Sequence, residues 1–127
     1  MLPFSIDLKP GLPVAEQILF AVKRAVATGQ LSPGDPFPSV RILSQELRIN
    51  PNTAHKVIAA LVTQGVLITT PAIGSLVADR TPGGSRERAE LLGAELERVV
   101  VEAKNLGLTI DEVQAGFVTQ WKRLTRK

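Results

Sequence analysis

Side chains that can hydrogen-bond to nucleic-acid bases and phosphates gather between positions 41 and 56. Asn52 and Thr53 stand at the predicted start of a helix. There an Asn can pair bidentately with adenine, and a Thr can bond phosphate or touch a thymine methyl. Arg41 precedes them, and its guanidinium can clamp a phosphate or a guanine edge. These residue types predict contact with DNA rather than catalysis.

Four further residues of this stretch are candidate DNA contacts. Lys56 suits a phosphate, and His55, the only histidine of the chain, suits a surface or DNA-facing position. Arg48 could add a contact to the DNA backbone or be a solvated turn residue. Asn50 is expected to cap the helix and to leave its backbone N–H groups free for a phosphate.

The sequence lacks the parts of an enzyme. It has no Gly-rich phosphate loop, no Ser-His-Asp arrangement and no metal-ligand spacing. Zero cysteines exclude disulfides, thiolate metal sites and a Cys nucleophile. We therefore expect a protein that is not an enzyme and that needs no cofactor and no metal.

Length and composition indicate a small globular protein. The 127 residues suffice for one compact domain, or for a small domain with an appended helical element, and 44% are hydrophobic and 21% charged. No apolar run approaches the length of a membrane-spanning helix, and no signal peptide is apparent, so we expect a cytoplasmic protein without a membrane partner. The net charge of +3 allows a polyanionic partner without requiring one.

Three helices are expected before position 66. Ile18, Val22 and Val26 recur every four residues and predict a helix over 13–28, with Pro13 at its first position. Ser39 is the expected N-cap of a second helix.

A tight turn follows the second helix near Leu47. Asn50 then caps a third helix, with Pro51 at its first position and Gly65 at its end. A short helix, a tight turn and a longer helix predict a helix-turn-helix.

Two β-prone runs, 66–70 and 75–78, follow the third helix and predict a small hairpin, or wing. Gly74 and Ser75 are turn residues of this wing and candidate phosphate contacts. The sequence at 79–85, DRTPGGS, is a strong breaker of regular structure. The expected fold class is mainly α with a small β-wing. A winged helix-turn-helix DNA-binding domain at 1–80 is followed by a two-helix C-terminal dimerisation element at 81–127.

Two amphipathic helices are expected in that last element, over 86–106 and 109–125, the second opened by a capping box at Thr109 and Glu112. Each has one apolar face and cannot close a core alone, so a second copy is expected to cover it. The element is short for enclosing a ligand pocket, and the sequence identifies no small-molecule effector. The predicted dimerisation residues are Leu92, Leu96, Val99, Ala103, Leu106, Val113, Phe117 and Trp121.

The chain resembles the GntR family of bacterial transcription regulators, and within it the short YtrA-like subfamily. The resemblance covers roughly residues 4–78. It implies a winged helix, a short dimerising pair of helices and a two-fold-symmetric operator. The segments that carry it are Pro13–Ile18, Gly29–Asp35, Phe37–Ser44, Asn50–Thr53 and the wing residues Gly74–Val77.

Two departures from the family pattern bear on stability and on DNA contact. Arg48 stands where the family usually has Gly; if its backbone is left-handed, Arg destabilises the fold by about 1 kcal/mol relative to Gly. Thr70, Pro71 and Ala72 stand where members commonly carry Arg and Gly. A wing without a basic residue is expected to contact phosphate only weakly.

These observations predict a sequence-specific DNA-binding transcription regulator, a repressor. It would bind an inverted-repeat, double-stranded operator as a homodimer through the helix that starts at Asn50. The alternative is a winged-helix protein–protein docking module without sequence-specific DNA binding. Salt-dependent binding to random duplex DNA separates the two, because a DNA regulator shows it and a docking module need not.

Overall fold

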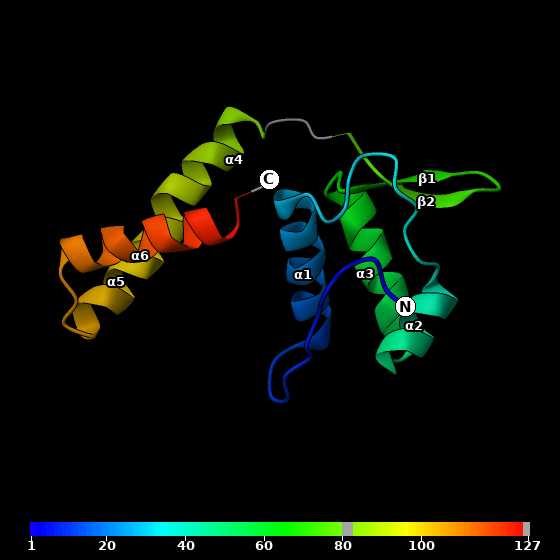
Figure 1. The fold of residues 1–127 in the computed structure, drawn as a ribbon, viewed down its shortest axis with the longest axis horizontal. Coiled ribbons are helices and arrows are strands. Elements are labelled where there is room, and N and C mark those ends of the chain that lie inside the picture. The colour runs from blue at the N-terminus through cyan, green and yellow to red at the C-terminus, as the bar shows by residue number, and fades with distance from the viewer. Residues whose placement is uncertain (80–82, 126–127) are drawn as a thin grey trace. The chain divides into compact units, whose positions relative to one another are not determined.

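The computed structural model describes residues 1–79 and 83–125, and these two stretches form two separate compact units. The first unit contains three helices and a hairpin, and the second contains helices only (Figure 1). This arrangement confirms the predicted fold class. The predicted domain boundary, between residues 80 and 81, lies outside the described residues.

The helices of the first unit are α1 (Val14–Thr28), α2 (Val40–Leu47) and α3 (Pro51–Thr63). Pro13, predicted as the first helical residue, is instead the N-cap of α1. Its ψ of 123° is extended, while its carbonyl already accepts the first helical hydrogen bond, from Gln17 N–H at 3.2 Å. The predicted start of α1 was therefore wrong by one residue.

The core of the first unit is built by side chains from all three helices, the loops and the hairpin. Burial of these apolar groups is the main favourable term that holds α2 and α3 on α1. The largest fully buried side chains are Ile18, Val22, Leu31, Leu43, Val57, Leu61, Leu67 and Val77.

Local caps set where α2 and α3 begin. Ser39 Oγ accepts a hydrogen bond from Ile42 N–H at 3.2 Å, and Asn50 Oδ1 accepts one from Asn52 N–H at 2.8 Å. Both predicted N-caps are confirmed. The turn between the helices is closed at Arg48, whose φ of 54° and ψ of 49° are left-handed.

Arg48 is thus a strained position, and Arg48→Gly is expected to raise the free energy of unfolding by about 1 kcal/mol. The Arg48 side chain is exposed, so its removal loses no core packing. Urea unfolding followed by circular dichroism measures the change. Arg48→Ala is the matched control, because it removes the side chain but keeps the Cβ that makes the conformation unfavourable. An equal gain from Ala and Gly would contradict backbone strain as the cause.

The wing consists of β1 (Leu67–Thr70) and β2 (Gly74–Val77), paired antiparallel. Figure 1 shows this hairpin projecting away from the three helices. The loop before α2 also pairs with β2, through Phe37 N–H to Ser75 O at 2.9 Å and Val77 N–H to Asp35 O at 2.8 Å. The sequence analysis assigned no pairing to this loop. The additional pairing ties the wing to the start of α2.

An extended N-terminal segment covers the core of the first unit. Phe4 is 4% exposed and stacks on Phe37, with 5.8 Å between the ring centroids. Leu2, Ile6 and Leu8 are partly buried against the same core. The even-numbered side chains therefore face inward, as in a strand. The sequence analysis assigned no role to this segment.

The second unit contains α4 (Ser85–Glu90), η1 (Leu91–Glu95), α5 (Leu96–Asn105) and α6 (Ile110–Arg123). A single α-helix was predicted over 86–106, but η1 is a π-helical turn, which has one more residue in its hydrogen-bonded ring than an α-helix. Residues before and after η1 therefore do not share one α-helical register. The predicted capping box that opens α6 is confirmed, since Thr109 Oγ1 accepts a hydrogen bond from Glu112 N–H at 3.2 Å.

Candidate nucleic-acid interface

The seven candidate DNA contacts between positions 41 and 56 lie on α2, on the turn that follows it, and on the first two turns of α3. Thr53 is half-buried. The other six are exposed: Arg41, Arg48, Asn50, Asn52, His55 and Lys56. The helix-turn-helix therefore brings all seven onto one short structural motif, whose core-facing side chains hold it rigidly on α1.

The first three residues of α3, Pro51 to Thr53, leave no backbone N–H group free for a phosphate, contrary to the expectation from sequence. Pro51 has no N–H, and the N–H of Asn52 donates to the Asn50 side chain at 2.8 Å. The N–H of Thr53 donates to the Asn50 carbonyl at 2.9 Å. The cap satisfies the donors that an anion would need, so contacts from this end of α3 must come from side chains.

The basic side chains of this surface are not held by acidic partners. Within the described residues, the one ion pair joins the Met1 amino group to Glu46. Arg41 and Lys56 make no side-chain hydrogen bond there either, whereas the Arg41 carbonyl accepts one from the buried Ser44 hydroxyl at 3.0 Å. The guanidinium of Arg41 and the ammonium of Lys56 are thus available to a polyanion.

The wing carries no charge. From Val66 to Ala78 the sequence has no acidic or basic residue, and Ile73 beside the turn is 68% exposed. Gly74 is exposed, with a φ of 96°, and Ser75 is half-buried, with its carbonyl bonded to Phe37. Both are placed mainly as turn and strand residues. A cation for phosphate has to come from elsewhere, such as Arg41, Arg48 or Lys56.

The second unit leaves its apolar side chains uncovered. Among its described residues only Ala103 is buried, while Trp121 is 78% exposed. Of the other predicted dimerisation residues, Leu96 and Val113 are half-buried, and Leu92, Val99, Leu106 and Phe117 are exposed.

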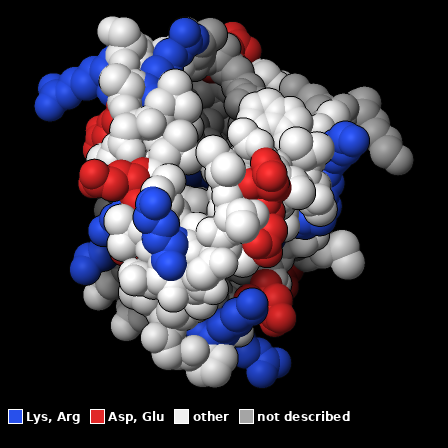
Figure 2. Space-filling view, turned by 90° about the vertical axis from the view of Figure 1, so that its left-hand side faces the viewer, with Lys and Arg blue, Asp and Glu red and all other residues white. Residues whose placement is uncertain are grey.

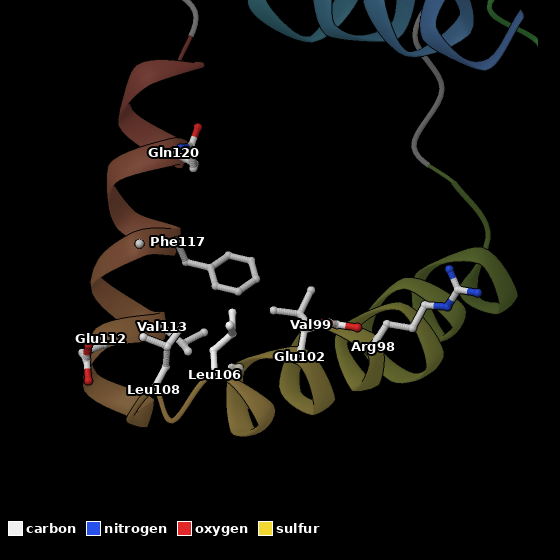
Figure 3. Close-up of a pocket in the computed structure, with 11 residues that line it drawn as sticks. Arg98, Val99, Glu102, Leu106, Leu108, Glu112, Val113, Phe117 and Gln120 are labelled. Atoms are coloured by element: carbon white, nitrogen blue, oxygen red, sulfur yellow. The ribbon is translucent and has the colours of Figure 1, made fainter. Parts of the chain in front are cut away.

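An apolar groove of about 590 Å³ lies between α5 and α6. Figure 3 shows Val99 and Leu106 pointing into it from α5 and its end, and Phe117 from α6. Sequence reasoning missed Leu108, Gly116 and Gln120 among its lining residues. Their spacing from Val113 and Phe117 along the same face of α6 could have found the last two.

The described residues contain neither a candidate metal site nor a candidate membrane-spanning helix. No group of His, Cys, Asp and Glu side chains there could hold a metal ion. None of the helices described is both long and apolar enough to cross a membrane. On the face shown in Figure 2, acidic and basic side chains are interspersed without a continuous patch of one sign.

A helix-turn-helix followed by a two-stranded hairpin, with polar and basic side chains exposed at the start of the second helix, defines a winged helix-turn-helix protein of the DNA-binding class. The chain belongs to the family described as bacterial regulatory proteins, gntR family, which matches residues 14–77. It is therefore a DNA-binding transcriptional regulator and not an enzyme.

The relatives are themselves regulators. YhcF, an HTH-type transcriptional regulator of Bacillus subtilis (strain 168), is 31% identical over 85% of this chain and 86% of its own. The HTH-type transcriptional repressor YtrA of the same organism is 27% identical over 85% of this chain and 84% of its own. A transcriptional antiterminator structure from Listeria monocytogenes EGD-e has a TM-score of 0.84 and 28% identity, and covers 95% of this chain and 91% of that chain.

Proposed function

We propose that this regulator is a cytoplasmic repressor that binds an inverted-repeat operator as a homodimer, with α3 of each copy in the major groove of one half-site. The observation that carries the proposal is the exposed set Arg41, Asn52 and Lys56 on one helix-turn-helix, whose side chains have no acidic partner within residues 1–79 and 83–125. These groups match base edges and phosphates. The relative YtrA is named a transcriptional repressor, which supports repression rather than activation.

The second unit supports the homodimer. Its helices expose a contiguous apolar groove and bury only Ala103 among the described residues. A large exposed apolar surface of this kind marks an interaction site. A second copy places two identical α3 helices about a two-fold axis, so the operator should be an inverted repeat with half-sites about one helical turn apart or a multiple of it.

Selection of bound sequences from a random duplex pool, followed by footprinting, tests the proposal. We expect an enriched inverted repeat with two protected half-sites. A folded dimer that enriches no sequence would instead favour the docking module, for which the uncharged wing and its exposed Ile73 are the supporting observation.

Affinity for DNA should fall steeply with salt. If Arg41, Arg48 and Lys56 of both copies each neutralise one phosphate, six counterions are released, and log K should fall against log [salt] with a slope of about −5. That slope corresponds to about 10³-fold weaker binding at 200 mM than at 50 mM salt. Fluorescence anisotropy with labelled duplex measures it. Lys23→Ala, an exposed cation on α1, should leave the slope unchanged, and a wild-type slope near zero would contradict the assignment.

A further inference from the structure

The face of α6 that lines the groove contains a glycine that the chain itself does not require. Gly116 lies in the middle of α6, where glycine is among the least favourable residues for a helix. No atom of the described residues lies within 4 Å of the position that a Cβ would occupy there. Nothing in this part of the chain therefore accounts for the missing side chain. A glycine on an exposed helix face allows another backbone to approach closely.

Two polar residues of the groove stand symmetrically about Gly116, one helical turn to each side. Glu112 comes four residues before it and Gln120 four residues after it, and both line the groove. In two helices that cross antiparallel at Gly116, each Gln120 would face the partner's Glu112. In a parallel crossing, Glu112 would face the partner's Glu112, and the two carboxylates would repel each other.

Local hydrogen bonds at the two ends of α6 leave Gln120 with a donor group and Glu112 with an acceptor atom. Gln120 Oε1 accepts two bonds from the Arg123 guanidinium, at 3.0 and 2.8 Å, which leaves the amide NH₂ of Gln120 as a donor. Glu112 Oε1 accepts from Thr109 N and Thr109 Oγ1, both at 3.1 Å, which leaves its second carboxylate oxygen as an acceptor. The amide donor and the carboxylate acceptor are thus complementary across a two-fold axis.

We propose that two copies of this chain pair through α6, which crosses the partner's α6 antiparallel at Gly116, with each Gln120 donating to the partner's Glu112. The inference rests on the homodimer proposed above and assigns its contact. In this dimer, Val113 and Phe117 of each copy lie beside the crossing and cover the apolar groove of the other copy.

Single cysteines test the crossing, because the chain contains no cysteine of its own. A residue on the two-fold axis meets its own copy, and a disulfide forms only when the two Cα atoms lie within about 7 Å. Gly116→Cys is expected to form a covalent dimer under mild oxidation, visible on a non-reducing gel. Gly93→Cys is the matched control, since Gly93 is also helical with no atom within 4 Å of its Cβ position. Equal cross-linking of the two variants, or none for Gly116→Cys, would overturn the crossing.

A charge swap tests the polar pair without a new cross-link. Gln120→Glu places two carboxylates opposite each other at both ends of the crossing, so the dimer dissociation constant should rise at least about tenfold. The double variant Glu112→Gln/Gln120→Glu should restore dimerisation, because it exchanges donor and acceptor and because Gln at this position keeps the capping box. Failure of the double variant to recover would refute the pairing.

Sedimentation of the wild-type chain distinguishes failure of the homodimer from failure of the α6 crossing. A wild-type chain that stays monomeric at every concentration would contradict the homodimer itself. If the wild-type chain is a dimer but Gly116→Cys does not cross-link and Gln120→Glu does not weaken dimerisation, only the α6 crossing would be contradicted.

Discussion

The variant Leu96→Asp/Val99→Asp is expected to be a monomer under conditions in which the wild-type chain is dimeric. Val99 lines the groove between α5 and α6, and Leu96 is half-buried one turn before it. In a two-fold dimer joined through this groove, the variant would bury at least the two unpaired carboxylates at position 99, and each buried ion without a partner costs several kcal/mol. Two such ions alone should therefore raise the dimer dissociation constant by far more than 10³-fold, because each 1.4 kcal/mol corresponds to a factor of ten.

Analytical ultracentrifugation measures the effect, and Val101→Asp is the matched control. Val101 is 50% exposed on the same helix but is not among the residues that line the groove. The control should remain dimeric, and an intact dimer in the double variant would show that the copies join elsewhere. The first unit has its own core, so both variants should keep its cooperative unfolding. The monomer should lose affinity for the full operator while it retains weak binding to one half-site.

Arg41→Ala is expected to weaken operator binding by about 1–3 kcal/mol for each base that the guanidinium reads. The side chain is exposed near the start of α2 and has no acidic partner among the described residues. Arg41→Lys distinguishes the two modes of contact. It keeps the charge but not the planar fork, so it should preserve much of a phosphate contact and lose a bidentate contact to guanine.

Titration of labelled operator and of random duplex by fluorescence anisotropy separates these effects. A base contact lowers the ratio of specific to non-specific affinity, whereas a phosphate contact weakens both about equally. Lys23→Ala removes the same charge from α1 and should change neither. If Arg41→Ala bound the operator as tightly as the wild-type chain, Arg41 would not belong to the interface.

The two variants address the two requirements of the proposed repressor separately. Arg41 acts within one winged helix, whereas Leu96 and Val99 act on the distance between two of them. If binding to two half-sites supplies most of the operator affinity, loss of the dimer should weaken binding more than loss of one side chain per half-site. In the intact dimer, binding of one winged helix holds the other near the second half-site at a high effective concentration.

The order of the helices and the hairpin could be predicted from the sequence, apart from the π-helical turn within 86–106. Ser39, Asn50 and Thr109 start helices through hydrogen bonds that span two or three residues, so their caps can be read from a short window. The helical and strand periods then indicate which side chains face the core. The helix-turn-helix, the wing and the exposed residues of α2 and α3 follow from such local patterns, which is why the fold class could be predicted.

Contacts between residues far apart in the sequence, and the choice of partner for a given N–H donor, could be found only in the folded structure. Phe4 stacks on Phe37, and the loop before α2 pairs with β2, through contacts whose partners no local pattern selects. The π-helical turn at Leu91–Glu95 changes the register that a strict α-helical period assumes. The first three residues of α3 offer no free N–H, because Asn50 satisfies the N–H groups of Asn52 and Thr53 and Pro51 has none. A sequence pattern names possible donors, whereas the folded backbone determines which of them remain unpaired.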